Sequence, residues 1–326
     1  MVHSKKFQKT LVTGGLGFIG SHLVDSLLCE GFDVTVLDDL SSGKLENIAH
    51  HQHHKGLEIV TGDIRDLNLV KKAMKDADVV FHEAALANVA LSVRNPILTN
   101  DVNVSGTVNI LKTAADLHVK RFIFASSAAI YGETRSSEKK EDDTLNPKSP
   151  YGVSKLAGEK YARSFFELYG LETVSLRYFN VYGPRQNFNL QAQYGGVITI
   201  FLNQLLKNAS PTIYGDGEQT RDFVYVKDIV QANLLAMESK NAVGESFNIA
   251  TGTRTRVNRI AEALKNTLSK KNIKDLHLDP RLGEVKHGYA NISKARKMLG
   301  YVPSVSFEEG VADLVEWYTT NRQFSS

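Results

Sequence analysis

Short apolar runs alternate with longer stretches of helical spacing through the first half of the chain. Such runs, when they stop at Gly, Asp or small polar residues, predict buried parallel strands, and apolar residues three and four apart predict helices between them. The predicted strands cover residues 10–13, 33–37, 57–60, 78–82 and 121–125, and the predicted helices cover residues 18–28, 66–74 and 95–118. Strands that alternate with helices in this way indicate an α/β fold built on a doubly wound parallel sheet.

The second half of the chain continues the pattern less regularly. Further strands are predicted over residues 171–179 and 246–249, and helices over residues 151–169, 195–206, 228–237, 257–268 and 306–319. We expect the strand over 246–249 to rejoin the main sheet, and no Gly/Ser-rich linker or internal repeat separates the two halves. The chain is therefore predicted to form a sheet domain from residues 1–178 plus about 222–252, and a smaller, interleaved C-terminal α/β lobe from residues 179–221 plus 253–326.

A glycine turn follows the first predicted strand. Its glycines let the backbone turn tightly, approach a pyrophosphate closely and pack the next helix onto the sheet. Asp38 ends the second strand about 20 residues later, where a carboxylate accepts hydrogen bonds from an adenosine ribose and repels a 2′-phosphate. The pattern predicts a Rossmann-type sheet that binds NAD rather than NADP, whereas the alternative is that Asp38 merely caps a loop. The residues assigned to the turn and the helix start are Gly14, Gly17, Phe18, Ile19 and Gly20.

Other small or polar residues fall at the ends of predicted strands. Asp63 and Ile64 follow the third strand, where the carboxylate could accept a hydrogen bond from an adenine amine. Ala84 and Ala85 follow the fourth strand, and small residues there leave room for a flat ring and a ribose. Because ligands of doubly wound folds bind outside the carboxyl ends of the strands, we expect the dinucleotide at this edge of the sheet. His82 is interpreted as a structural histidine rather than an acid or base.

Tyr151 and Lys155 stand one helical turn apart at the start of the predicted helix over 151–169. An ammonium beside a phenol favours the phenolate, so this pair could supply a base although tyrosine ordinarily titrates near 10. The alternative is a packed tyrosine and a solvated lysine on an amphipathic helix. Asn103 and Gly106 interrupt the predicted helix over 95–118, and such a break usually has a packing or functional reason.

Composition and charge exclude several classes of protein. Charged residues make up 23% and hydrophobic residues 42% of the chain, and the net charge of +3 gives no sign of a nucleic-acid or membrane partner. The single cysteine, Cys29, excludes an intramolecular disulfide, fits a reducing cytoplasm, and is expected to be a small buried thiol. No signal peptide appears and no apolar run approaches the roughly 18 residues of a membrane span, so a cytoplasmic location is predicted.

Four histidines cluster in the polar connection between the second and third strands, at positions 50, 51, 53 and 54. Imidazoles at this density could bind a metal, but no carboxylate pattern or ordered surrounding accompanies them in the sequence. We therefore interpret the cluster as a local composition bias in an exposed helix end and loop, and predict no metal site.

Seven longer motifs run through the chain. They are TGGLGFIG (13–20), HEAAL (82–86), SSAAIYG (126–132), SPYGVSK (149–155), RYFNVYGPRQ (177–186), GDGEQTRDFVYV (215–226) and RLGEVKHGYANISKARKMLGY (281–301). With Asp38, they make the chain similar over essentially its whole length to the extended short-chain dehydrogenase/reductases of the NAD-dependent epimerase/dehydratase family. Within that family it resembles the UDP-glucose and UDP-N-acetylglucosamine 4-epimerases. The motifs are highly specific for the family and less specific for the sugar.

The resemblance implies roles for individual residues. Ser127 and Tyr151 would hydrogen-bond the sugar 4-hydroxyl, while Lys155 would bind the nicotinamide ribose and keep Tyr151 acidic. Asn103 would support the cofactor side. The residues implied to bind substrate are Ala87, Ser127, Asn180, Gly196, Val197, Arg221, Arg281 and Gly288. The two arginines would hold the diphosphate, although the alternative for each is an ordinary surface salt bridge.

Departures from related enzymes narrow the chemistry that the resemblance implies. Ala128 and Ala129 stand where dehydratases carry an Asp-Glu pair, so the acid for water elimination is missing. Nucleotide-sugar decarboxylases usually have a Glu there, which is also absent. Gly288 stands where epimerases restricted to unacetylated sugars hold a bulky tyrosine, which leaves room for a 2-N-acetyl group. Ala87 stands where some relatives have Lys and keeps the pocket small-walled.

The resemblance thus implies an isomerase that uses NAD to epimerise a UDP-hexose at C4, through a transient 4-keto sugar and a returned hydride. The expected substrate pairs are UDP-GlcNAc with UDP-GalNAc, and UDP-glucose with UDP-galactose. The alternatives are a UDP-glucuronate 4-epimerase, another nucleotide-sugar oxidoreductase or, outside the enzymes, an NAD-binding sensor. A homodimer formed through the helices over 95–118 and 151–169 is also implied.

Overall fold

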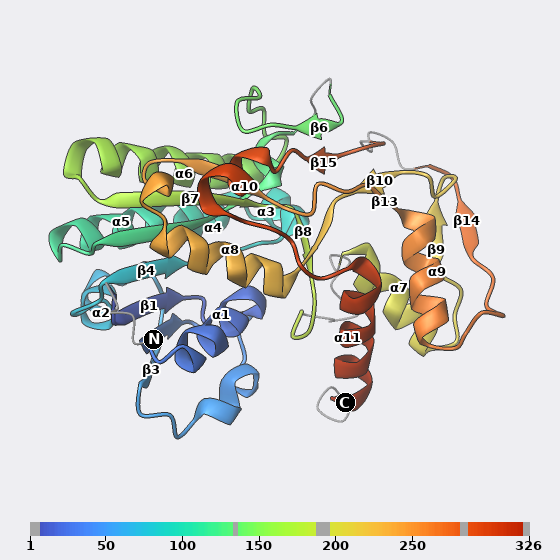
Figure 1. Ribbon diagram of the computed structural model, residues 1–326, viewed down its shortest axis with the longest axis horizontal. Coiled ribbons are helices and arrows are strands. Elements are labelled where there is room, and N and C mark those ends of the chain that lie inside the picture. Colours follow the sequence, from blue (N-terminus) through green and yellow to red (C-terminus); the bar gives the residue numbers. More distant parts are fainter. Residues whose placement is uncertain (1–6, 133–135, 187–195, 281–285, 322–326) are drawn as a thin grey trace.

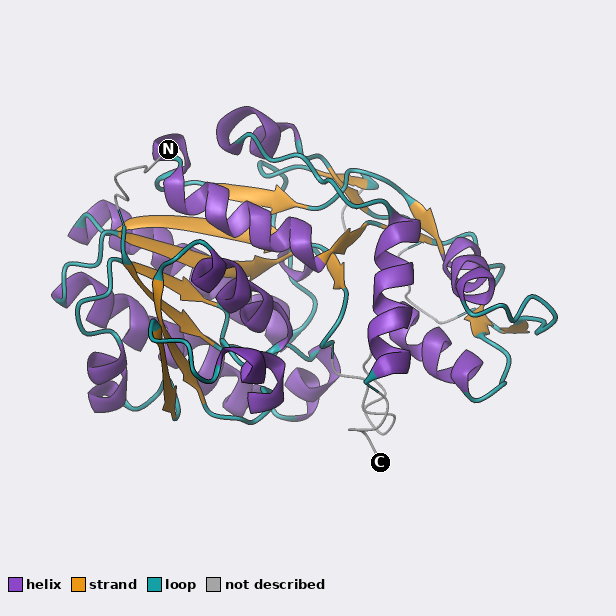
Figure 2. Cartoon of the chain, turned by 60° about the horizontal axis from the view of Figure 1, so that its bottom comes forward, coloured by secondary structure: helices purple, strands orange, loops and turns teal. Residues whose placement is uncertain are grey.

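The computed structural model describes residues 7–132, 136–186, 196–280 and 286–321. A seven-stranded sheet with helices on both faces fills the larger part of the molecule, and a smaller lobe lies beyond one end of it (Figure 1). A second view shows the sheet between two layers of helices, with the C-terminal helix α11 (Phe307–Thr320) beside it on the side of the lobe (Figure 2).

All neighbouring strands of the main sheet run parallel, in the order β12-β7-β5-β4-β1-β2-β3. The chain starts in the middle of the sheet, winds to one edge and then returns to build the other, which confirms the doubly wound arrangement. β12 rejoins the sheet beside β7, as predicted. The strands are β1 (Lys9–Thr13), β2 (Asp33–Asp38), β3 (Leu57–Thr61), β4 (Val79–His82), β5 (Arg121–Ser127), β7 (Glu172–Tyr178) and β12 (Ser246–Ile249).

Helices bury both faces of the sheet. Because successive strand residues point to opposite faces, Leu11 packs into one core and its neighbour Val12 into the other. This double burial explains why the strands appear in the sequence as continuous apolar runs. The helices are α1 (Phe18–Cys29) and α8 (Val226–Glu238) on the face of Val12, and α2 (Leu67–Ala73), α5 (Thr107–Asp116) and α6 (Pro150–Tyr169) on the face of Leu11.

A third hydrophobic cluster forms the core of the smaller lobe, from α7 (Val197–Leu206), α9 (Val257–Thr267) and α11. The chain passes back and forth between the lobe and the sheet, and α10 (Ser293–Leu299) packs against β12. This crossing supports the interleaved division predicted from the sequence, which stays a prediction. The short strands are β6 (Glu138–Lys139), β8 (Asn180–Tyr182), β9 (Thr212–Tyr214), β10 (Thr220–Arg221), β11 (Phe223–Tyr225), β13 (Thr255–Arg256), β14 (Leu276–Leu278) and β15 (Tyr289–Ala290).

The long helix predicted over residues 95–118 is divided. A π-helical turn, η2 (Asp101–Gly106), separates α4 (Pro96–Asn100) from α5, so the stretch is helical and is interrupted where the sequence indicated a break. The turn includes Asn103 and Gly106, the two residues that signalled a break. A Cβ added at Gly106 would lie 2.6 Å from the Ile64 side chain, so close packing requires the glycine here.

Other local features were missed or misjudged from the sequence. Cys29 is exposed rather than buried, because α1 ends there and its buried face stops at Leu27 and Leu28. The helical segments not predicted are α3 (Val89–Arg94), α10, η1 (Leu45–His51), η3 (Ala128–Ile130) and η4 (Lys240–Ala242). Within the described ranges, none of the helices combines the length and the apolar character needed to cross a lipid bilayer.

Candidate active site

The first turns of α6 carry Tyr151 and Lys155. Ser149 caps the helix by accepting a hydrogen bond from the backbone N–H of Gly152 at 3.1 Å. Gly152 lets the helix approach the segment after β5, because a Cβ there would lie 2.7 Å from the Ala129 carbonyl oxygen. The start of α6 is therefore fixed against the carboxyl end of β5, where ligands of this fold bind.

The Tyr151 side chain meets Ser127, the last residue of β5. Burial raises the pKa of Tyr151 above its usual value, the hydrogen bond with Ser127 lowers it, and the charge on Glu83 raises it further. The net direction is upward. Lys155 is not among these causes, so its implied role of keeping Tyr151 acidic stays a prediction.

Lys155 is buried, with only 4% of the residue exposed. Its Nζ donates a hydrogen bond to the carbonyl oxygen of Ala125 at 2.7 Å and lies 5.1 Å from the centre of the Phe124 ring. Burial lowers the pKa of Lys155 to about 8, and the charge on Glu83 partly opposes that shift. The alternative of a solvated lysine on an amphipathic helix is therefore wrong.

The carboxyl group of Glu83, a partly buried residue, acts on both side chains of this pair, and the sequence analysis gave it no role. The hydroxyl of Tyr178 donates to Glu83 Oε1 at 2.8 Å, and Nδ2 of Asn233 donates to the Tyr178 hydroxyl oxygen at 2.7 Å. Burial raises the pKa of Glu83 to about 7, although the Tyr178 hydrogen bond and the Lys155 charge both lower it. The available signal was a glutamate placed directly after a buried strand, at the ligand-binding edge of the sheet.

Asn103 links three segments around the site. Its Nδ2 donates to Ser154 Oγ at 3.0 Å, and its Oδ1 accepts a hydrogen bond from the Leu86 backbone N–H at 2.8 Å. The π-helical turn η2 therefore joins α6 to the segment that follows β4. Since Leu86 lines the neighbouring pocket, this contact supports the predicted role of Asn103 on the cofactor side.

A pocket of about 440 Å³ lies at the carboxyl ends of β1, β2, β3 and β4. All of the residues assigned to the glycine turn and to the strand ends line it, together with Ala87. They are Gly14, Gly17, Phe18, Ile19, Gly20, Asp38, Asp63, Ile64, Ala84 and Ala85. Lining residues that the sequence analysis did not assign include Asp39, Ser41, Ser42, Arg65, Leu86, Leu98 and Val102.

The residues of this pocket fit a dinucleotide. Gly14 has a φ of +69°, and a Cβ there would lie 2.8 Å from the Ala84 backbone nitrogen, so glycine is needed to close the turn against the end of β4. The N-terminus of α1 thereby faces the pocket and can receive a pyrophosphate. Asp38 lines the pocket and also accepts hydrogen bonds from the backbone N–H groups of Leu16 at 3.0 Å and Leu40 at 2.9 Å. Its carboxylate thus caps the loop and remains positioned for a ribose.

His82 is structural, as interpreted from the sequence. Its Nδ1 lies 2.7 Å from Thr13 Oγ1 and its Nε2 lies 2.9 Å from Thr107 Oγ1. Complete burial lowers the pKa of His82 to about 3, so the imidazole is neutral at physiological pH. It joins β1 and β4 to α5 underneath the pocket wall.

Asn180, Arg221 and Gly288, assigned to the substrate, come together although they are distant in the sequence. Nδ2 of Asn180 donates to the Asp222 carbonyl oxygen at 2.8 Å. The Gly288 backbone N–H donates to the carbonyl oxygen of Thr220, the neighbour of Arg221, at 3.2 Å. A Cβ placed on Gly288 would meet no atom of the described residues within 4 Å, so the position is open toward that part of the chain.

The remaining assigned residues are less informative. Gly196 and Val197 lie at the start of α7, and Arg281 lies outside the described residues. The sequence analysis missed Asp222, which is buried and accepts hydrogen bonds from the Thr251 hydroxyl at 2.6 Å and from the backbone N–H groups of Gly252 and Ala290. Its carboxylate fixes the chain next to Arg221 to the segment after β12 and to β15.

The arrangement can perform proton transfer beside a bound dinucleotide. Ser127 and Tyr151 present hydroxyl groups to one point, and Lys155 and Glu83 set the charge around them. Glu83 also lines the pocket for the dinucleotide and therefore lies between that pocket and the Tyr151–Lys155 pair.

Comparisons with known proteins agree with this geometry. The sequence model of the NAD-dependent epimerase/dehydratase family matches residues 10–250. A putative UDP-glucose 4-epimerase of Methanocaldococcus jannaschii is 44% identical over 96% of this chain and 99% of its own length.

Two solved structures superpose closely. A UDP-N-acetylglucosamine 4-epimerase from Methanobrevibacter ruminantium M1, in complex with UDP-N-acetylmuramic acid, has a TM-score of 0.91 and 42% identity, with 97% of this chain and 100% of that one covered. A UDP-glucose 4-epimerase from Thermotoga maritima, with UDP-glucose, has a TM-score of 0.89 and 39% identity, with 97% and 100% covered.

Proposed function

The chain belongs to the NAD-dependent epimerase/dehydratase family, and on this basis we propose that it interconverts the C4 epimers of a UDP-hexose. The observation that carries the proposal is the meeting of Ser127, Tyr151 and Lys155 at the carboxyl end of β5, beside the pocket that fits NAD. Relatives and structural neighbours named as UDP-sugar 4-epimerases support the same activity.

When bound, NAD would accept the hydride from C4 of the sugar and return it to the opposite face. Tyr151 takes the proton of the sugar 4-hydroxyl and later returns it. Ser127, which is hydrogen-bonded to the Tyr151 phenol, would bind the same sugar hydroxyl. Lys155, held by the Ala125 carbonyl oxygen, would bind the nicotinamide ribose. The glycine turn and Asp38 would hold the rest of the cofactor.

The surroundings of Ser127 favour epimerisation over dehydration. The residues that follow it, Ala128 and Ala129, form the turn η3 and offer only methyl groups. The backbone N–H of Ala129 donates to Ser127 Oγ at 3.1 Å, which orients the hydroxyl. Because no carboxylic acid stands at these two positions, they cannot supply the acid that water elimination needs.

The sugar specificity is proposed from Gly288. The open position at its Cα supports acceptance of a 2-N-acetyl group, so we propose that UDP-GlcNAc and UDP-GalNAc are substrates, alongside UDP-glucose and UDP-galactose. The name of the Methanobrevibacter relative supports this choice. Arg221 follows Thr220 in β10, and Thr220 accepts the hydrogen bond from the Gly288 backbone, so we propose that Arg221 holds the diphosphate.

Separate incubations with UDP-GlcNAc, UDP-glucose and UDP-glucuronate, without added NAD, test the proposal. Formation of each 4-epimer is measured by chromatography, with the Tyr151→Phe protein as the control. Conversion of UDP-GlcNAc is expected. Conversion of UDP-glucose alone would contradict the argument from Gly288, and conversion of UDP-glucuronate alone would favour the glucuronate alternative. No conversion even with NAD added would reject the epimerase and leave a sensor role.

We also propose that the chain forms a homodimer through α6 and the segment of α4, η2 and α5. Large apolar side chains on these helices are exposed, and Ile97 on α4 and Leu168 on α6 are 78% and 75% exposed. A second copy would cover them. Light scattering should give the dimer mass for the native chain and the monomer mass for Leu168→Glu. The same substitution at Leu276, exposed on β14 of the lobe, should leave the dimer intact.

A further inference from the structure

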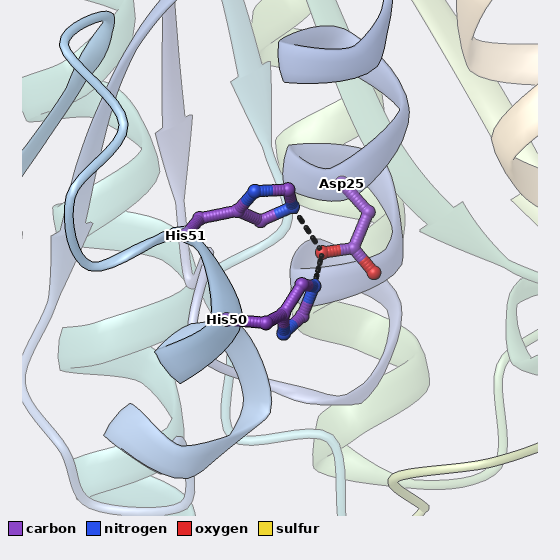
Figure 3. Close-up of side chains that lie close together, drawn as sticks. All are labelled: Asp25, His50 and His51. Carbon is purple, nitrogen blue, oxygen red and sulfur yellow. Dashed lines mark hydrogen bonds and ion pairs between the residues drawn. The ribbon is translucent and has the colours of Figure 1, made fainter.

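Asp25 of α1 is the meeting point of three segments that are distant in the sequence. Its Oδ1 lies 3.0 Å from His50 Nε2 and 3.1 Å from His51 Nε2, both in η1. Its Oδ2 pairs with Arg185 Nη2 at 2.7 Å. Figure 3 shows the two imidazole rings entering from one side and pointing at a single carboxylate oxygen.

The spacing of these ligand atoms suits a metal ion. One ring nitrogen of His50, one of His51 and a carboxylate oxygen of Asp25 lie within 4.8 Å of one another. Ligands of a tetrahedral ion with bonds of about 2.0–2.1 Å are separated by roughly 3.3 Å. The nitrogen–oxygen distances of 3.0 and 3.1 Å need to open by only a few tenths of an ångström to admit the ion.

The structure supplies what the sequence pattern lacked. The carboxylate comes from α1, and the ordered surrounding comes from Arg185, whose bond to Oδ2 orients the carboxylate so that Oδ1 faces the histidines. η1 is held in place because Nδ2 of Asn47 donates to the Leu16 carbonyl oxygen at 2.8 Å. The His50 side chain is 51% exposed, so an ion can reach the three ligands from solvent.

We propose that Asp25, His50 and His51 form a binding site for a divalent transition-metal ion such as Zn²⁺, with water completing the coordination. Two imidazoles and one carboxylate are ligands that select such ions over Mg²⁺ and Ca²⁺, which prefer oxygen. For binding, each imidazole presents the lone pair of Nε2 and carries its proton on Nδ1.

Arg185 also limits the affinity of this site. Its guanidinium neutralises part of the Asp25 charge, so binding is weaker than at a closed four-ligand zinc site. The ion would join η1 to α1. Binding to the folded chain alone therefore raises its melting temperature. The site is separate from the proposed proton transfer, which involves none of these residues.

The test uses the full chain without a histidine tag. Zn²⁺ is measured by equilibrium dialysis with elemental analysis, and Co²⁺ by its visible absorption, which reports the coordination geometry. One ion per chain is expected. Removal of one ligand in His51→Gln or Asp25→Asn should weaken binding by at least about tenfold and abolish the metal-dependent rise in melting temperature.

The matched control is His53→Gln, because His53 is exposed in the same histidine-rich loop. This variant should bind one ion as tightly as the native chain. The proposal is overturned if the native chain binds no ion above the buffer blank, or if His53→Gln weakens binding as much as His51→Gln. NAD content, measured after acid extraction, shows that each variant is folded.

Discussion

The Tyr178 hydroxyl donates a hydrogen bond to Glu83 Oε1 at 2.8 Å, and Tyr178 and the neighbouring Lys155 are both buried. The charge of Glu83 raises the pKa values of both Tyr151 and Lys155. Glu83 itself titrates at about 7, so this charge changes within the physiological pH range. The protonation of this carboxyl group is therefore coupled to the phenol of Tyr151, which we propose as the acid–base group.

The first prediction concerns the pH dependence of catalysis in Glu83→Gln. The amide keeps the shape and removes the negative charge, so the pKa of Tyr151 falls and the phenolate forms at lower pH. The acidic limb of the kcat/KM profile should move down by a few tenths to about one pH unit. Glu58→Gln, at an exposed position of β3, should leave the profile unchanged. An unmoved or upward-shifted limb in Glu83→Gln would show that the coupling is absent.

The second prediction concerns the pH dependence of the folding stability of Glu83→Gln. The pKa of Glu83 rises from 4.5 to about 7 on folding, so the folded state binds more protons between these values. Native stability should therefore fall as the pH rises through this window, whereas the amide of the variant cannot titrate. From about pH 5 to about pH 8, the free energy of unfolding of the variant should rise by up to about 3 kcal/mol relative to that of the native chain. Urea unfolding at both pH values measures this, and a pH-independent difference contradicts it.

Tyr151→Phe should reduce kcat by about 10² to 10⁴-fold, because the ring remains and the acid–base group is lost. NAD content should not change, since the pocket lining is intact. Tyr161→Phe is the matched control, because Tyr161 lies on the same helix and is 43% exposed. Its kcat should equal that of the native chain. Equal losses in both variants would indicate damage to α6 rather than loss of a base.

Gly14→Ala should abolish stoichiometric NAD binding. A Cβ there would lie 2.8 Å from the Ala84 backbone nitrogen, at the wall of the pocket, and φ is +69°. Gly170→Ala separates the two effects, because Gly170 has a φ of +70° with no atom within 4 Å of its Cβ. The control should lose only about 1 kcal/mol of stability and keep NAD. Calorimetric titration with NAD distinguishes the two, and normal NAD binding by Gly14→Ala would contradict the assigned cradle.

Gly288→Tyr should fold, because no atom of the described residues lies within 4 Å of the added Cβ, and should discriminate against acetylated sugars. The ratio of kcat/KM for UDP-GlcNAc to that for UDP-glucose should fall by about tenfold or more as the ring fills the space. Gly288→Ala is the size control and should retain the native ratio. If the ratio is unchanged in both variants, the acetyl group does not occupy the space at Gly288.

The order of elements was predictable from the sequence because its causes are local. Buried parallel strands need continuous apolar runs, and the turn after β1 needs glycine at Gly14 for its positive φ. The candidate residues at the strand ends then followed from the rule that carboxyl ends of parallel strands share one edge. Asn103 was recognisable because an amide and a nearby glycine disturb a helix, which here forms a π-helical turn.

The partners of these residues were not predictable in the same way. Glu83 and Tyr178 are separated by 95 positions and meet only because β4 and β7 lie in one sheet. Arg221 and Gly288 meet only because the chain returns to the lobe after β12. Burial, which raises the pKa of Tyr151, is likewise a property of the packed molecule.

The sequence by itself determined the fold class, the cofactor edge of the sheet and the family, because periodicity, turn chemistry and motif spacing are read along the chain. The tertiary structure alone decided which side chains meet. Asp25 joins His50 and His51 with Arg185, which lies 160 positions beyond it in the chain. No local pattern encodes such a contact, because it depends on how helices and loops pack in three dimensions. The histidines looked like a composition bias until α1 supplied their carboxylate.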